Sequence, residues 1–181
     1  AIIFSVMKFF TLIIFSVFFL FKLSVQPCFA QQSQIDTTEK IIQNLKEDTL
    51  SVQNLLLLAS DCYQSEPLMA IGYCERAKII AEKINYTRGI SDCYGWLGYL
   101  YYNKGDVIKA LDYEYRGLKI RLEIEDHEGT ATSYNNIGYI YQEQNDEEKA
   151  LEHYLLSLKI RIKIDNKFGQ AESYNNIGAL Y

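Results

Sequence analysis

The sequence repeats itself with a period of forty residues, and this repetition limits the possible folds more than any other feature. The phrase SYNNIG occurs at 133–138 and again at 173–178. With the same period KAL recurs at 109–111 and 149–151, LKIR recurs at 118–121 and 158–161, and linker glycines recur at 89, 129 and 169. Periods of about 20 to 50 residues are typical of stacked arrays, in which one unit is too small to bury its own apolar face. The chain is therefore predicted to form a repeat array.

Each unit is predicted to contain two helices. One face of the first helix is formed by residues at i, i+3, i+4 and i+7, namely Tyr134, Ile137, Gly138 and Tyr141. The same period predicts one apolar face of the second helix, made of Ile108, Leu111, Tyr115, Leu118 and Leu122. The turns between the two helices contain Asp106 and Asp146, which are suited to cap the second helix, and Pro67 is suited to the first helical position of the earliest second helix.

Glycine recurs inside the predicted first helices, at Gly98, Gly138 and Gly178. A glycine in a helix costs about 1 kcal/mol relative to alanine, so a physical reason is required. Without a Cβ atom the first helix can lie directly against its partner, and Ala110 and Ala150 leave matching room. Close packing within each helix pair is therefore expected.

These residues resemble the tetratricopeptide repeat (TPR), in which an aromatic, Leu-Gly and Tyr are followed by Ala and a second aromatic. The best copy consists of Tyr134, Ile137, Gly138, Tyr141, Ala150 and Tyr154. The preceding copy has Glu114 where the pattern has an aromatic, which leaves the local packing open. The forty-residue period is similar to that of kinesin light chains and many bacterial signalling proteins. The resemblance implies an all-α fold, an α-solenoid of stacked antiparallel helix pairs in a right-handed superhelix.

The resemblance covers residues 49–181 and implies the following organisation. An N-terminal segment at 31–48, with a short helix near Thr38–Lys46, is followed by a degenerate first repeat at 49–89. The second repeat spans 90–129, the third spans 130–169, and 170–181 form the first helix of a truncated fourth repeat. The sequence is accordingly expected to be a fragment of a longer polypeptide.

The first thirty residues predict a secretory signal peptide, with residues 1–6 outside the natural product. Met7 and Lys8 supply a start and a positive charge, residues 9–21 are almost wholly apolar, and Cys28–Ala30 fits a cleavage site. The alternative is an uncleaved membrane helix at 1–23, which Lys8 interrupts. Cleavage would place the mature protein outside the cytoplasm, with only transient membrane contact through the signal peptide or contact through a segment downstream.

The net charge bears on the class of binding partner, and the cysteines bear on whether the chain contains a disulfide. Two of the 18 basic residues lie in the first thirty, which leaves 16 against 23 acidic residues and a net charge of −7, so nucleic acid is excluded as a partner. Three cysteines remain, and two alternatives stay open for them. Cys62 and Cys74 could form a disulfide, or Cys62, Cys74 and Cys93 are small buried apolar residues.

TPR arrays generally bind peptides or proteins in a groove lined by their first helices, so the resemblance implies a non-catalytic interaction scaffold with a protein or peptide ligand. Asparagines spaced one unit apart could hold a peptide backbone, and aromatic residues could anchor its side chains. The predicted groove residues are Trp96, Tyr99, Tyr102, Asn136, Tyr139 and Asn176. The alternative is that these asparagines satisfy helix ends and these aromatics pack between units.

An enzymatic function, a cofactor and a metal are not predicted. His127, in a predicted linker, and His153, on a second helix, are both expected to be solvated, because neither has a partner at catalytic or metal-ligand spacing. A second function remains open. Exported TPR arrays that resemble this one often precede a membrane helix and a histidine kinase, nucleotide cyclase or transcription-regulator domain, so this chain could be the sensory part of a signalling protein.

Overall fold

The computed structural model describes residues 46–181 of the chain. The predicted signal peptide at 1–30 and the short helix near Thr38–Lys46 lie outside these residues, apart from Lys46. All regular elements of the described part are α-helices, and none of them is long and apolar enough to cross a membrane. The helices are α2 (Thr49–Cys62), α3 (Pro67–Lys83), α4 (Thr87–Asn103), α5 (Val107–Glu123), α6 (His127–Glu143), α7 (Glu147–Lys163) and α8 (Lys167–Gly178).

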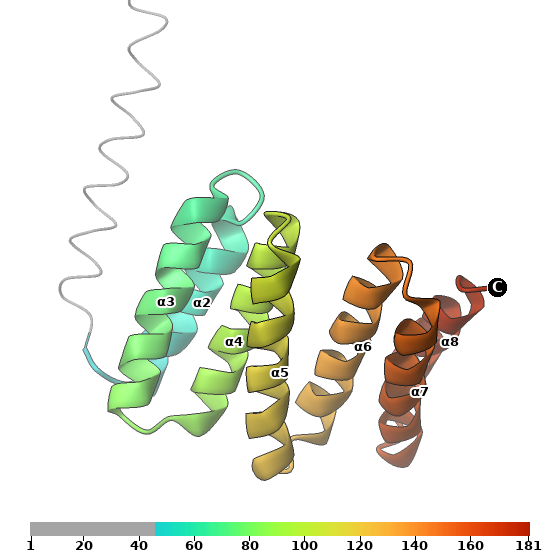
Figure 1. The fold of residues 1–181 in the computed structure, drawn as a ribbon. Coiled ribbons are helices and arrows are strands. Elements are labelled where there is room, and N and C mark those ends of the chain that lie inside the picture. Colours follow the sequence, from blue (N-terminus) through green and yellow to red (C-terminus); the bar gives the residue numbers. More distant parts are fainter. Residues whose placement is uncertain (1–45) are drawn as a thin grey trace, which may run out of the picture. The chain divides into compact units, whose positions relative to one another are not determined.

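The helices form a stack of antiparallel pairs, which confirms the predicted all-α solenoid. The pairs are α2–α3, α4–α5 and α6–α7, and α8 packs on α7. Figure 1 shows the turns within each pair along the upper edge of the stack and the turns between pairs along the lower edge. The first helices of neighbouring pairs also touch, since α2 contacts α4 and α4 contacts α6. The first helices therefore line up along one face, here called the first-helix face.

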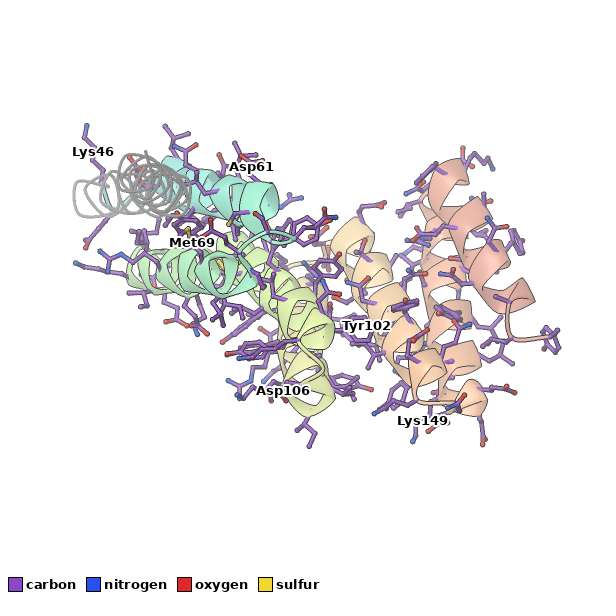
Figure 2. The ribbon with its side chains drawn as sticks, turned by 90° about the horizontal axis from the view of Figure 1, so that it is seen from above. Lys46, Asp61, Met69, Tyr102, Asp106 and Lys149 are labelled. Atoms are coloured by element: carbon purple, nitrogen blue, oxygen red, sulfur yellow. The ribbon has the colours of Figure 1, made fainter. Side chains whose placement is uncertain are left out.

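Side-chain caps begin five of the helices. Asp106 accepts a hydrogen bond from the backbone N–H of Lys109, and Asp146 accepts one from that of Lys149, both at 3.2 Å. Both predicted caps are confirmed, and Pro67 is the first residue of α3 as predicted. Figure 2, which looks down on the stack, labels Asp106 at the start of α5 and Lys149 in the first turn of α7. The other caps are Asp48, Asp126 and Asn166.

Each of the five turns after α3, α4, α5, α6 and α7 contains one residue with a positive φ angle, two positions after the preceding helix ends. The left-handed conformation at this position allows the chain to satisfy the last helical carbonyls. After α5, for example, the N–H of Asp126 donates to the carbonyl of Arg121 at 2.9 Å. The residue is glycine in one of the five turns, and the five residues are Asn85, Gly105, Glu125, Asn145 and Asp165.

The first helix of each later unit begins earlier than its predicted boundary. Helices α4, α6 and α8 begin at 87, 127 and 167, so the predicted boundaries at 90, 130 and 170 fall within their first turns. The interpretation of the recurring glycines as linker residues was wrong, and His127 is the first residue of α6. A Cβ atom at Gly129 would lie 2.9 Å from Cδ of Arg121, and one at Gly169 would lie 2.7 Å from Nε of Arg161. These glycines therefore make room for an arginine from the preceding helix.

The glycines inside the first helices do allow close packing. A Cβ atom at Gly98 would lie 2.8 Å from Cγ of Glu114, and one at Gly138 would lie 2.8 Å from Cδ1 of Tyr154. The predicted close approach is confirmed for these two residues. Gly178 has no atom that would contact such a Cβ among the described residues, because no second helix covers α8 there.

The predicted apolar face of α5 is buried only in part, at Leu118. Ile108, Tyr115 and Leu122 are exposed, with 84%, 41% and 53% of their surfaces accessible. The buried residues of α5 are instead Ala110, Glu114, Gly117, Leu118 and Arg121. A Cβ atom at Gly117 would lie 3.3 Å from the carbonyl oxygen of Ser91, so α5 lies too close to α4 for larger side chains at that point. Apart from Leu118, the buried residues of α5 are therefore small or polar, and three of its larger apolar residues are exposed.

The three cysteines of the described part are free thiols. Cys74 and Cys93 are buried and Cys62 is partly buried, which agrees with their interpretation as small apolar residues. Burial raises the pKa of Cys93 to about 12 and raises that of Cys74 further. Both thiols are consequently protonated at neutral pH and unreactive.

Candidate functional site

The first-helix face contains a pocket of about 540 Å³, here called the first-helix pocket. Side chains from α2, α4 and α6 line it, and Arg121 reaches it from α5. Its apolar side, here called the aromatic wall, consists of Tyr63, Trp96 and Tyr99. Its polar side consists of Asp92, Arg121 and Asn136. A cavity of this size, largely apolar with a few converging polar groups, is typical of ligand sites.

The rings of the aromatic wall pack against one another, edge to face at Tyr99 and tilted between Tyr63 and Trp96. The ring centroid of Tyr63 lies 5.5 Å from that of Tyr99 and 6.2 Å from that of Trp96, and Trp96 and Tyr99 are 6.1 Å apart. Trp96 and Tyr99 lie one turn apart on α4, and Tyr63 comes from the end of α2. Because the rings fix one another, they offer a ligand a rigid apolar surface at low conformational cost.

A second pocket, of about 610 Å³, continues from the aromatic wall. It shares Tyr63 and Tyr99 with the first-helix pocket and extends to Pro67, Leu68 and Lys104. The aromatic wall therefore lies between two hollows, so an extended ligand could contact both of them.

The polar side of the first-helix pocket is organised around Arg121. Its Nη1 donates to the hydroxyl of Ser133 at 2.6 Å, and its Nη2 lies 3.6 Å from Oδ1 of Asp92. Burial raises the pKa of Asp92, although the neighbouring Arg121 acts to lower it. Asn136 donates through Nδ2 to Oε1 of Glu114 at 2.9 Å, which leaves its amide oxygen without a hydrogen bond among the described residues. The pocket therefore presents a fixed cation, a carboxyl and an amide oxygen.

Glu114 lies beneath this polar side and is almost completely buried, with 1% of its surface exposed. Desolvation raises the pKa of its carboxyl to about 7, against the opposing effects of Asn136 and Arg121. Its Oε2 atom has no hydrogen-bond partner. The residue occupies the position that the aromatic Tyr154 fills one unit later, so a titratable group replaces an aromatic core residue directly behind the pocket.

The pocket brings together three of the six predicted groove residues, Trp96, Tyr99 and Asn136. Tyr102 and Tyr139 do not line it and instead pack against each other, with ring centroids 5.4 Å apart. Figure 2 shows Tyr102 beside the next helix pair. Burial and the hydrogen bond to Tyr139 raise the pKa of Tyr102.

The predicted row of asparagines is engaged within the array. Asn176 donates to Oδ1 of Asn135 at 2.9 Å, and Asn136 donates to Glu114. Each amide nitrogen therefore has an internal partner. The arrangement leaves amide oxygens, which are acceptors for peptide N–H groups, as the groups available to a ligand.

Sequence reasoning did not identify Tyr63, Asp92 or Arg121 as pocket residues. Arg121 belongs to the LKIR phrase that recurs at 158–161. An arginine repeated at the same position of two helices was a signal that it makes a structural contact in each unit. Asp92 lies four residues before Trp96 and seven before Tyr99, so the helical period places it on the same face. No comparable signal exists for Tyr63, because it lies in the degenerate first unit.

The expectation that His153 is solvated was wrong. The residue is 9% exposed, and its Nδ1 lies 2.8 Å from the carbonyl oxygen of Lys149. A carbonyl can only accept, so Nδ1 donates to it, and Nε2 lies 3.3 Å from the hydroxyl of Tyr115. His153 therefore packs as a polar core residue among Tyr115, Tyr134 and Tyr141. The described residues contain no group of His, Cys, Asp and Glu side chains arranged to hold a metal ion.

Comparison with known proteins agrees with the stacked pairs. Residues 90–163 match the family described as tetratricopeptide repeat. The matched segment covers most of α4 and all of α5 to α7, and the match supports a TPR protein. No curated protein matches the sequence.

Two solved structures share the fold. The apo form of RapI has a TM-score of 0.71 at 19% identity, and the alignment covers 82% of this chain and 54% of that one. The TPR domain of Arabidopsis FLU has a TM-score of 0.58 at 21% identity, with 64% of this chain and 97% of that one covered. This chain thus spans about half of the RapI chain. At these identities the likeness concerns the fold alone.

Proposed function

We propose that the protein is an interaction scaffold that binds an extended peptide segment of a partner protein along its first-helix face. The observation that carries this proposal is the first-helix pocket, in which a rigid aromatic wall faces a fixed cation and unsatisfied amide oxygen. Aromatic anchors of this kind dominate the binding energy of protein interfaces. TPR repeats generally bind proteins or peptides, and the family match supports the same role here.

The test is binding of the full chain to a library of short peptides, with two variants of the pocket. Trp96→Ala removes the centre of the aromatic wall, and Asn136→Ala removes the amide. We expect each to weaken binding by about tenfold or more, as for central interface residues. Phe168→Ala is the matched control, because Phe168 is an aromatic residue of α8 that is 85% exposed and does not line the pocket. Unchanged affinity in both pocket variants would contradict the proposal.

We further propose that the protein acts outside the cytoplasm, on the basis of the signal-like segment at residues 1–30. Sequencing the N-terminus of the secreted protein should find Gln31 as the first residue. Retention of Met7 in the processed protein would contradict this. The sensory role, in which the array is one part of a larger signalling protein, is tested by the reading frame after Tyr181, where a membrane helix and an output domain should follow.

A further inference from the structure

Two arginines, one repeat apart, occupy equivalent positions in α5 and α7. Arg121 donates through Nη1 to Ser133, and Arg161 donates through Nη1 to Ser173 at 2.9 Å. Both arginines are buried, with 7% and 3% of their surfaces exposed, and both have an Nε without a hydrogen-bond partner. The two arginines therefore differ only in the other partners of their guanidinium groups, and these partners can be compared directly.

Arg161 is enclosed by hydrogen-bonding partners. Its Nη1 also donates to the carbonyl oxygen of Gly169 at 2.9 Å, and its Nη2 donates to Oε2 of Glu172 at 2.8 Å. The other oxygen of Glu172 accepts from Asn135 at 3.2 Å, and Asn135 accepts in turn from Asn176. This chain of contacts covers the arginine and neutralises its charge.

Arg121 has no such cover. Thr132 stands where the next unit has Glu172, and Gly95 stands where it has Asn135. The remaining acid, Asp92, lies 3.6 Å from Nη2, which is longer than the 2.7–3.2 Å of a good hydrogen bond. A Cβ atom at Gly95 would lie 2.9 Å from Nη2, so the missing side chain is what opens the guanidinium to the pocket. The first-helix pocket therefore contains a cation whose hydrogen-bonding capacity is incompletely used.

The chemistry of the missing partner follows from this comparison. A guanidinium prefers a carboxylate, which matches its planar geometry, and at the equivalent arginine a carboxylate fills the place. Of the two acids near Arg121, Asp92 lies too far from Nη2 for a good hydrogen bond, and Glu114 bonds Asn136 from beneath the pocket, so neither occupies the place of a ligand carboxylate. The aromatic wall lies across the same pocket and fits an apolar group next to the carboxylate.

We propose that the first-helix pocket takes an acidic side chain of a bound peptide at Arg121, with the apolar neighbour of that acidic residue against Tyr63, Trp96 and Tyr99. This inference rests on the proposed function and specifies its ligand. The ligand carboxylate takes the place that Glu172 occupies at Arg161.

The experiment uses Trp96, the single tryptophan of the chain, as a fluorescent reporter inside the pocket. The probes are capped nine-residue peptide pools without tryptophan, degenerate except for a central Phe–Glu, Phe–Gln or Phe–Lys pair. The full chain should bind the Phe–Glu pool about tenfold more tightly than the Phe–Gln pool, as expected for a charge-assisted hydrogen bond, and the Phe–Lys pool most weakly.

Two variants should abolish the preference for Glu over Gln. Arg121→Gln removes the cation, and Gly95→Asn supplies the cover that Asn135 provides one unit later, so the second variant tests the idea even if the first does not fold. Arg116→Gln is the matched control, because this arginine of α5 is exposed and pairs with Asp112. It should keep the full preference.

Each outcome decides between distinct conclusions. Equal binding of the three pools, or an unchanged preference in Gly95→Asn, overturns this inference but leaves peptide binding intact. Tightest binding of the Phe–Lys pool overturns it in favour of recognition by Asp92. Binding of free 3-phenylpropionate as tight as that of the Phe–Glu pool overturns it in favour of a small carboxylate. Failure of every pool to bind overturns both this inference and the proposed function.

Discussion

The pairs α4–α5 and α6–α7 have the same backbone plan but different interiors. At one position of the second helix, the first pair buries Glu114 and the second buries Tyr154, and both side chains pack against a glycine of the partner helix. The hydroxyl of Tyr154 donates to Gln142 at 2.7 Å, whereas one oxygen of Glu114 has no partner. The stack therefore tolerates a destabilising buried residue, Glu114, in the pair next to the pocket, whereas the next pair keeps the aromatic residue of the repeat pattern, Tyr154.

The same contrast extends to the contacts between pairs. The guanidinium of Arg161 joins α7 to α8 through three hydrogen bonds, one of them an ion pair, and that of Arg121 joins α5 to α6 through Ser133. Buried polar groups that lack partners are expensive, and they concentrate at functional sites. The pair α4–α5 is therefore expected to be the less stable of the two, and it is also the pair that borders the first-helix pocket.

The largest effect is expected at the regular pair. Tyr154→Ala should lower the free energy of unfolding by about 3–5 kcal/mol, since it removes a fully buried aromatic ring and leaves a cavity against Gly138. Glu114→Ala at pH 8 should cost far less, because it also removes a buried charge. Urea unfolding of the full chain followed by circular dichroism measures both. Leu155→Ala is the control, as its side chain is half exposed; equal losses for Tyr154→Ala and Glu114→Ala would contradict the contrast.

The titration of Glu114 should make the stability of the irregular pair depend on pH. Its folded-state pKa of about 7 lies above the ordinary value of 4.5, so the folded protein keeps a proton that the unfolded chain releases between these values. Stability should therefore fall as pH rises through this window, by roughly 3 kcal/mol at about 1.4 kcal/mol per pH unit. Glu114→Gln cannot titrate and should lack this loss.

Urea unfolding of the full chain and of Glu114→Gln at pH 4.5 and pH 8 provides the measurement. The variant should gain stability relative to the natural chain as the pH rises, and Glu125→Gln, an exposed carboxyl, is the matched control. A stability difference that does not change with pH would show that the pKa of Glu114 is the same in the folded and unfolded chain, and would contradict the prediction.

The helical stack was predictable from the sequence, because the forty-residue period and the spacing of glycine and tyrosine depend only on how helices pack. The caps at Asp106 and Asp146 followed from local chemistry in the same way. The buried face of α5 was not predictable from hydrophobicity. Helix contact at Gly117 leaves space only for small residues, so Ile108 and Leu122 face outward although they are the more apolar.

The site was only partly predictable for a related reason. Trp96, Tyr99 and Asn136 could be placed on the first-helix face by the helical period. Arg121 comes from a second helix and reaches the pocket only because Gly95 leaves a gap, a relation between two helices that no single-helix pattern contains. Glu114 was noticed as a departure from the repeat, but its contact with Asn136 required the fold.

A smaller effect should separate the two arginines. Ser133→Ala removes the one hydrogen bond between Arg121 and α6, and should lower stability by about 1.5–3 kcal/mol, the range for bonds to charged groups. Ser173→Ala should cost less than about 1 kcal/mol, because Nη1 of Arg161 keeps the carbonyl of Gly169. Urea unfolding of the two alanine variants makes the comparison, and a greater loss in Ser173→Ala would reverse the assignment of the weaker junction.

The smallest effect concerns the turns. Within the pairs, the left-handed position is Gly105 after α4 and Asn145 after α6, both of which tolerate a positive φ angle, whereas the turn between the pairs has Glu125 at φ 55°. Because a side chain other than Asn is strained there, Glu125→Gly should raise the free energy of unfolding by about 0.5–1 kcal/mol. Asn145→Gly should change it by less than about half of that, since Asn already tolerates this conformation. Thermal unfolding of both variants would measure the difference, and a larger gain for Asn145→Gly would mean that the turn within the pair, rather than the turn between the pairs, carries the strain.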